Sequence, residues 1–203
     1  MPSGPSLREK KNLAVKQALF DAAMDLFKEK GFDGTSVDEI AEKAGYSRAT
    51  YFNHFGTKHG VLRFHGQRLQ SRVEALFAQA DADSPPLDRI RQLLLAMARE
   101  ADSHCDELKL IYMYSHNDPE YLLRPTPARM RVFELVQELV TAAQQAGQMR
   151  RDMASKVLAF HISSTYQSAV IASIGGYCKA EEAVEAGWMF LLDGIRGGHS
   201  LAE

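Results

Sequence analysis

A short polar segment near the N-terminus carries side chains that can hydrogen-bond the edges of nucleic-acid bases. Ser47 is followed by Arg48, Ala49, Thr50 and Asn53. Guanidinium groups donate to guanine, and asparagine amides pair with adenine. On a helix that begins after Ser47, these small or polar residues share one exposed N-terminal face. The major groove of DNA would accept such a face.

Two short predicted helices position this face. Ser36 and Glu39 stand three residues apart before an apolar pattern, which is the spacing of a capping box and predicts a helix start. Gly45 follows the last apolar position of that helix, where the chain leaves through a left-handed backbone. Ser47 can then cap a second helix. Together these signals predict a helix-turn-helix motif over residues 36–55.

The preceding segment is predicted to be an amphipathic helix that supports the motif. Its apolar residues recur at helical spacing, and Gly31 ends the pattern. The residues of this stripe are Leu19, Ala22, Ala23, Leu26 and Phe27.

The combined pattern resembles the DNA-binding domain of the TetR family of transcriptional regulators. The resemblance covers residues 13–73 and implies a ligand-binding and dimerisation domain over residues 74–203. Residues 1–12 open with Pro, Ser and Gly and then gather basic residues, which predicts a flexible tail, and the resemblance implies that such a tail can touch DNA. The residues that carry the resemblance are Thr35, Ile40, Ala41, Ala44, Gly45, Ser47, Arg48, Thr50, His54, Phe55 and Lys58.

The resemblance implies a set of DNA-contacting residues. Those expected to face bases or adjacent phosphates are Arg48, Ala49, Thr50 and Asn53, and those expected to position the DNA backbone are Thr35, Ser36, Ser47, Tyr51, His54 and Lys58. Tyr46 and Phe52 complete the predicted surface. The family commonly has a phosphate-binding tyrosine at the position of Phe52. Either Tyr51 replaces that contact, or Asn53, His54 and Lys58 carry more of it.

The distribution of charge agrees with a local DNA-binding surface. The formal net charge of the whole chain is −2, which is unusual for a DNA-binding protein. Residues 1–70 nevertheless hold eleven Lys and Arg against eight Asp and Glu, whereas the remainder holds thirteen against eighteen. Phosphate binding needs cations at the contact surface and not over the whole protein.

The rest of the chain keeps helical periodicity, so the expected fold is all-α. A long connecting helix is expected after residue 58, and further helices over about 87–105, 107–116 and 130–146, from Asp152 to Gly175, and over 181–196. The last two are apolar on more than one face, which indicates either a purely internal core or packing against a second copy. The resemblance implies dimerisation through these two helices. The expected interface residues are Ile162, Ala169, Ala172, Val184, Trp188, Leu191 and Ile195.

The segment between the motif and this interface predicts a site for a partly apolar small-molecule effector, because aromatic and methionine residues with polar tips suit such cavities. The candidate residues are Met97, His104, Tyr112, His116, Phe133, Phe160, His161 and Tyr166. The resemblance implies that an effector which binds better to one conformation shifts the population away from DNA binding.

Two other functions remain as alternatives. An enzyme is disfavoured, since no Glu-x-x-His pair, nucleophile elbow, phosphate loop or metal-ligand spacing occurs, and no cofactor or metal is expected. A helix-turn-helix that binds DNA without sequence preference, or binds a protein, would show steep salt dependence and equal affinity for all sequences. No membrane-spanning or signal segment is evident, and a cytosolic location is expected.

Overall fold

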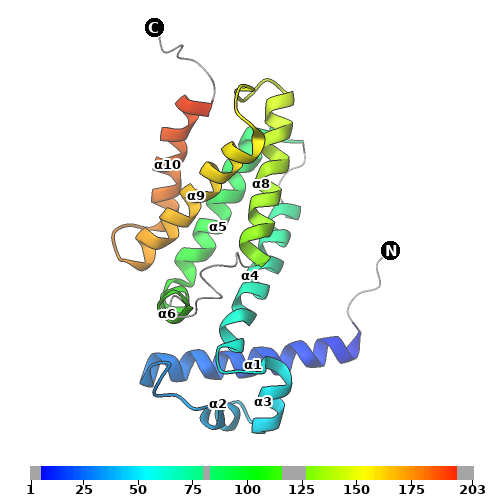
Figure 1. Ribbon diagram of the computed structural model, residues 1–203, viewed down its shortest axis with the longest axis vertical. Coiled ribbons are helices and arrows are strands. Elements are labelled where there is room, and N and C mark those ends of the chain that lie inside the picture. Colours follow the sequence, from blue (N-terminus) through cyan, green and yellow to red (C-terminus); the bar gives the residue numbers. More distant parts are fainter. Residues whose placement is uncertain (1–5, 80–82, 116–126, 196–203) are drawn as a thin grey trace. The chain divides into compact units, whose positions relative to one another are not determined.

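The computed structural model describes residues 6–79, 83–115 and 127–195 (Figure 1). These residues form α-helices joined by turns, and none of them lies in a strand. The prediction of an all-α chain is therefore confirmed.

The chain divides into two compact units, which are considered separately. The boundaries of the first are Met1–Gln67 and Leu110–Leu123, and those of the second are Arg68–Lys109 and Arg124–Glu203. Two helices, α4 and α6, contribute residues to both units. Helical periodicity gave no sign that the end of α6 would join the N-terminal unit.

The first unit is built on three N-terminal helices. They are α1 (Leu7–Lys30), α2 (Val37–Lys43) and α3 (Arg48–Phe55), to which the starting turns of α4 (Gly60–Gln79) and the last turns of α6 (Cys105–Ser115) are added. Their shared core contains Leu19, Phe20, Phe27, Ile40, Tyr51, Val61 and Ile111, all of which are almost fully buried. Both α2 and α3 lie within residues 36–55.

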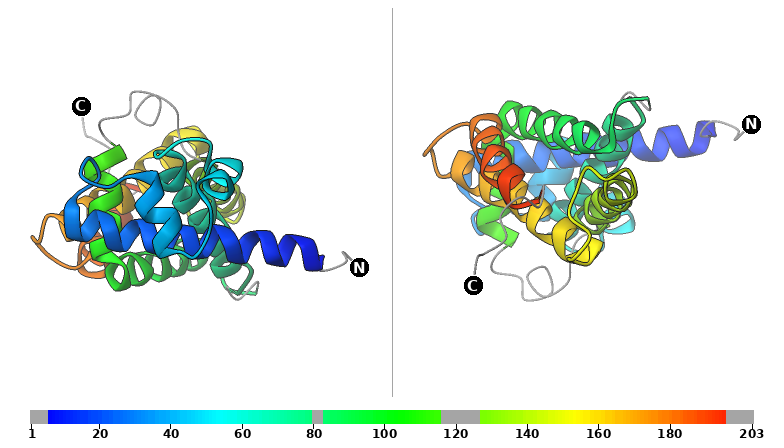
Figure 2. Two further views of the ribbon diagram at one scale, coloured as in Figure 1. Left: turned by 90° about the horizontal axis from the view of Figure 1, so that it is seen from below. Right: turned by 90° about the horizontal axis from the view of Figure 1, so that it is seen from above.

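Helix α1 begins earlier than the sequence suggested. Ser6 caps it and forms a capping box with Glu9, so residues 7–12 are helical and not part of a flexible tail. The reciprocal bonds of a capping box satisfy two N–H groups that the first turn would otherwise leave unpaired. Residues 6–14 are all exposed, and Figure 2 shows the N-terminal turns of α1 extending past α2 and α3 of the same unit.

The second unit is a helical bundle around one apolar core. Its helices are the remainder of α4, α5 (Pro86–Ser103), the first turns of α6, α8 (Pro127–Gln145), α9 (Ser155–Ile174) and α10 (Ala180–Ile195). Helix α5 packs against α8, α9 and α10, and α9 packs against α8 and α10. Among the largest fully buried side chains are Ile90, Leu93, Leu94, Leu135 and Ile162.

Helix α9 starts at Ser155, three residues later than predicted. Asp152 was expected to begin it, but its carboxylate accepts hydrogen bonds from the Arg150 guanidinium at 2.7 and 2.5 Å. Ala154 occupies the N-cap position without a side-chain bond. The Asp152 carboxylate is thus taken up by a neighbouring cation and does not cap the helix.

Helix α9 is more apolar than the sequence analysis recognised, since no membrane-spanning segment was expected there. Within the described residues, it is the helix that is long and apolar enough to cross a membrane. Length and composition alone are weak grounds for a membrane span, because helices of soluble proteins meet the same criteria. One face of α9 packs on its own bundle, and the other is considered with the predicted interface below.

Candidate nucleic-acid interface

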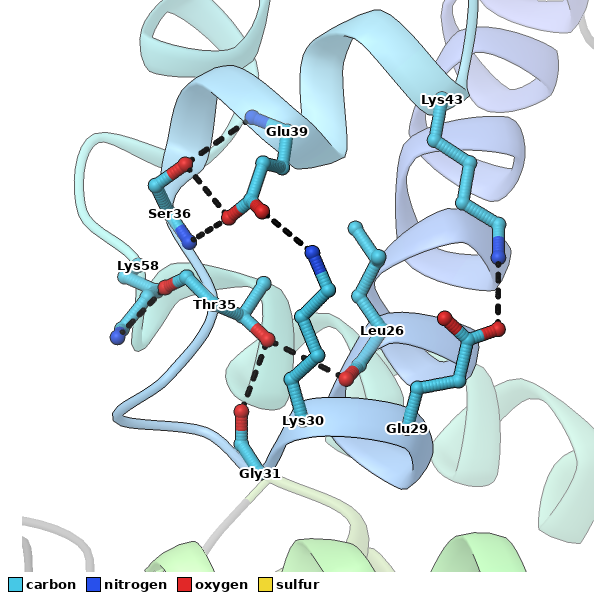
Figure 3. A network of polar contacts seen from close by, with 9 residues as sticks. All are labelled: Leu26, Glu29, Lys30, Gly31, Thr35, Ser36, Glu39, Lys43 and Lys58. Carbon is cyan, nitrogen blue, oxygen red and sulfur yellow. Dashed lines mark hydrogen bonds and ion pairs between the residues drawn. The ribbon is translucent and has the colours of Figure 1, made fainter.

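The first helix of the motif is fixed by a capping box that is joined to α1 (Figure 3). Ser36 Oγ accepts from the N–H of Glu39, and the Glu39 carboxylate accepts from the Ser36 N–H at 2.8 Å. The same carboxylate accepts from the Lys30 ammonium at 2.5 Å. These bonds, chiefly that from Lys30, lower the pKa of Glu39 to about 2. The predicted capping box is confirmed, and the polar atoms of Ser36 are engaged in it.

Thr35 is placed inside the unit and not on its surface. Its side chain is 2% exposed, and its hydroxyl donates to the carbonyl oxygens of Gly31 and Leu26 at 2.8 and 3.3 Å (Figure 3). The expectation that its hydroxyl positions the DNA backbone is wrong for this geometry. Thr35 instead ties the start of α2 to the end of α1.

The turn of the motif has the backbone that its residue types require. Gly45 has a φ of +74°, in the left-handed region that side chains disfavour. Ser47 then caps α3, with Oγ accepting from the N–H of Thr50 at 3.1 Å. The hydroxyls of Ser47 and Thr50 lie 2.9 Å apart. The N-terminal end of α3 is therefore well defined.

Tyr51 anchors α3 in the core and cannot replace the missing phosphate-binding tyrosine. Its ring is fully buried and lies 5.2 Å from that of Phe55. Its hydroxyl donates inward to the carbonyl oxygens of Lys58 and Thr57 at 3.2 and 3.4 Å. Burial raises the pKa of this phenol. The predicted DNA contact of Tyr51 is corrected to an internal one.

Lys58 is likewise directed inward. Its ammonium donates to the carbonyl oxygens of Phe32 and Thr35 at 2.6 and 3.0 Å, and it lies 4.3 Å from the centre of the Phe32 ring. These contacts join the loop before α2 to the loop after α3. In this structure Lys58 therefore holds the motif together, whereas the sequence predicted a phosphate contact.

His54 contributes no positive charge to the surface near neutral pH. Burial and the nearby Lys16 ammonium both lower the pKa of its ring. The half-buried imidazole is then neutral at pH 7. A hydrogen bond to a phosphate remains open to it, but an ion pair does not.

The remaining predicted residues form one exposed surface on α3 and the turn before it. Thr50 is half-buried, and the exposed residues are Tyr46, Ser47, Arg48, Ala49, Phe52 and Asn53. Arg48 Nη1 donates to Asp38 Oδ2 of α2 at 2.5 Å. Asp38 was not among the predicted site residues, although it is an acidic residue in the first turn of α2.

The predicted effector residues do not gather at one place, and Tyr112 and His116 fall within the boundaries of the first unit. Met97, Phe133 and Tyr166 belong to or pack against the bundle core, and His104 lies 3.2 Å from the Glu100 carboxylate. Tyr112 is half-buried. Phe160 and His161 are exposed on the outer face of α9, so they do not line the interior as predicted. His116 lies outside the described residues.

The predicted interface residues also lie differently from expectation. Ile162, Ala169, Val184 and Trp188 are buried in the core of their own bundle, so they cannot form an outer contact surface. Ala172 and Leu191 are half-buried, and the side chain of Ile195 lies outside the described part. The large apolar residues exposed on α9 and α10 are Val157, Phe160, Ile171, Met189 and Phe190. The prediction that α9 and α10 are apolar on two faces was correct. The residues chosen for the dimer interface, however, lie mostly on the face that packs inside the chain's own bundle.

The fold and the exposed face of α3 define a helix-turn-helix DNA-binding protein. Residues 19–63 match the model of the family described as bacterial regulatory proteins, tetR family. The transcriptional repressor DhaR of Mycobacterium sp. (strain GP1) is 27% identical over 167 residues, which are 77% of this chain and 81% of DhaR.

Solved structures agree over nearly the whole chain. FadR of Thermus thermophilus, a TetR family transcriptional repressor solved with lauroyl-CoA, is 25% identical, with a TM-score of 0.61 over 93% of this chain and 98% of FadR. SmeT, the repressor of a Stenotrophomonas maltophilia multidrug efflux pump, is 18% identical and supports the fold, with a TM-score of 0.71 over 93% of this chain and 96% of SmeT. Residues 19–63 are thus a DNA-binding domain of the tetR family of bacterial regulatory proteins, and the whole chain is similar to TetR family transcriptional repressors.

Proposed function

We propose that this protein is a sequence-specific repressor that binds a near-palindromic DNA operator as a homodimer and leaves it when a small effector binds. The observation that carries this proposal is the exposed polar face of α3, which presents Arg48, Ala49 and Asn53 from a helix whose opposite side is anchored by Tyr51 and Phe55. A rigid helix with exposed polar groups at its N-terminal end suits the major groove.

The role of Arg48 distinguishes specific from general DNA binding. If Arg48 reads a guanine edge, Arg48→Ala should cost about 1–3 kcal/mol at the preferred operator and much less on random duplexes. The matched control is Arg129→Ala, which removes an exposed arginine from α8 in the other unit. Fluorescence anisotropy on both kinds of duplex measures the difference. Equal loss on every sequence would contradict base reading and favour the alternative of DNA binding without sequence preference.

The proposed homodimer uses the exposed apolar faces of α9 and α10. Large apolar side chains that are exposed on two packed helices are costly in water when they gather into a patch, and such patches are commonly covered by a partner. A two-fold dimer would place two copies of α3 about one DNA turn apart, as near-palindromic operators require. A cytoplasmic location follows from the proposed access to DNA.

The proposed effector site lies in the core of the second unit, near Met97, Phe133 and Tyr166. Burial raises the pKa of the Tyr166 phenol, and the carboxylates of Glu100 and Asp102 raise it further, so its hydroxyl stays protonated and able to donate. An apolar interior with a few polar groups suits a partly apolar effector. The lauroyl-CoA bound by the Thermus relative makes acyl thioesters the class to test first.

Release from DNA tests the effector site. Lauroyl-CoA is titrated against the protein–operator complex for Tyr166→Phe and for the control Tyr177→Phe, which removes a hydroxyl from a tyrosine that is 86% exposed. We expect Tyr166→Phe to keep its operator affinity but to need up to about tenfold more effector for release, the cost of one lost hydrogen bond. Identical release curves for both variants would place the effector elsewhere.

A further inference from the structure

An ion pair connects the two helices of the motif at its exposed surface. Arg48 Nη1 of α3 lies 2.5 Å from Asp38 Oδ2 of α2, and the Arg48 guanidinium lies 5.3 Å from the centre of the Phe52 ring. The side chains of Arg48 and Asp38 remain 61% and 60% exposed. Exposed ion pairs contribute little to folding stability, so the fold does not depend on this pair. Its main effect is on the direction and freedom of the arginine.

A carboxylate beside a base-reading arginine changes which bases that surface tolerates. In the major groove, guanine presents acceptors at N7 and O6, thymine presents one at O4, and hydrogen-bond donors occur only on the amino groups of cytosine and adenine. A carboxylate therefore accepts from cytosine N4 and is repelled by the guanine and thymine edges. Such a repulsive element separates the correct site from similar sequences, at some cost in total affinity for a polyanion.

We propose that Asp38 is a specificity-determining residue of the DNA site, an inference that rests on the proposed function. Asp38 holds the Arg48 guanidinium in one orientation toward a guanine, and its own carboxylate selects a base with an amino donor, most simply cytosine, at the neighbouring position. The two side chains act as one reading unit because they are already paired in the free protein. A preformed pair loses less side-chain freedom on binding.

The experiment compares selected DNA motifs. Duplexes from a random pool are selected with the unaltered protein, Asp38→Asn, Asp38→Glu and the control Glu42→Gln, and affinities are then measured on the preferred site and its single-base variants. Glu42 is exposed one helical turn further along α2, so its loss removes the same charge near the DNA. The unfolding temperature of each variant is measured in parallel.

We expect Asp38→Asn to keep the guanine preference and to lose the preference at the neighbouring position. Discrimination there should fall from about tenfold or more to below about threefold, since a good base contact is worth at least a factor of five to ten. Asp38→Glu should restore part of the preference, because the carboxylate returns on a longer stem. Glu42→Gln should change the affinity of all sequences alike.

Three results would overturn the inference. If Asp38→Asn discriminates at every position as the unaltered protein does, Asp38 does not determine specificity. If it changes the affinity of all sequences in parallel, as Glu42→Gln does, Asp38 acts only through its charge. If Asp38→Asn lowers the unfolding temperature and weakens all sequences equally, its role is structural. Absence of any motif for the unaltered protein would overturn the proposed function itself, which is a different outcome from any of these.

Discussion

The Lys58 ammonium closes the loops on both sides of the helix-turn-helix motif. It is half-buried and donates to two backbone carbonyls, those of Phe32 and Thr35. Lys58→Met keeps the aliphatic stem and removes both bonds. We expect the free energy of unfolding to fall by about 2 kcal/mol, the typical value of a hydrogen bond to a charged group. Urea denaturation followed by circular dichroism measures this change.

The control for this prediction is Lys11→Met, which removes an exposed lysine from the N-terminal turns of α1. That change should leave the unfolding free energy within about 0.5 kcal/mol of the unaltered value. If both variants had the same stability, the contacts of Lys58 would be dispensable, and a direct phosphate contact would become its main role.

Residue type alone could locate the motif but could not divide its polar residues between folding and binding. The caps Ser36 and Ser47 and the turn residue Gly45 follow from local backbone requirements, and these three were predicted correctly. Thr35, Tyr51 and Lys58 carry groups that suit either a phosphate or a backbone carbonyl. Which partner they take depends on how the loops pack, and periodicity contains no information about that packing.

At the scale of elements, the N-terminus of α10 is capped by a residue from another helix. The Asp102 carboxylate of α5 accepts from the N–H groups of Ala180 and Glu181 at 2.7 and 3.1 Å and from the Ser173 hydroxyl at 2.8 Å. Burial raises the pKa of Asp102, but the bonds from Ala180, Glu181 and Ser173 outweigh it, and the pKa lies below its usual value.

Replacing this carboxylate should destabilise the second unit. Asp102→Asn keeps the shape but turns an amide group toward N–H donors, and we expect a loss of about 1–2 kcal/mol, as for other lost N-caps. Because the folded-state pKa is lowered, the stabilisation is fully present above the unfolded pKa of about 4 and is lost as the pH falls through the folded value. Urea denaturation at pH 7 and below pH 4 measures both effects.

Asp102→Asn and the unaltered protein should therefore differ in their free energy of unfolding at neutral pH, and this difference should shrink in acid. Glu138→Gln, which alters an exposed carboxylate on α8, serves as the control and should show no comparable loss at pH 7. A difference between Asp102→Asn and the unaltered protein that persisted unchanged below pH 4 would show that the carboxylate charge is not what stabilises α10.

The helices themselves were largely predictable, because apolar spacing and glycine stops mark them locally. The cap of α10 was not, since its donors and its acceptor stand far apart in the sequence. That contact depends on which helices become neighbours, which is a property of the folded bundle. The start of α9 was misplaced for a different and local reason, because the Asp152 carboxylate pairs with Arg150 two residues before it.

At the scale of the whole molecule, the exposed apolar residues of α9 and α10 predict self-association. Phe160 is 60% exposed and Phe190 is 84% exposed. Phe160→Asp should weaken the dimer by about 3 kcal/mol or more, because a charge would be buried in an apolar contact. Analytical ultracentrifugation measures the mass of the particle, and circular dichroism checks that the helices persist.

Met130→Asp is the matched control, since Met130 is an exposed apolar residue on α8. It should leave the dimer intact. A Phe160→Asp variant that remained dimeric at the same concentrations would show that this face of α9 is not the interface, and the half-buried residues at the end of α10 would then be tested next.

Sequence pattern predicted that α9 and α10 need partners on two sides, yet it assigned the faces wrongly. The reason is that Ile162 and Trp188 look as suitable for an interface as Phe160 and Phe190 do. Only the packing of α9 between α8, α5 and α10 decides which stripe is covered by the chain itself.

Selection of bound duplexes from a random DNA pool, at near-physiological salt and with the purified protein, tests most directly whether α3 reads sequence. We predict an enriched motif with two-fold symmetry and half-sites about one DNA turn apart, as two copies of α3 in a dimer require. Recovery of no motif, with equal and steeply salt-dependent affinity for all duplexes, would contradict sequence-specific regulation by this protein.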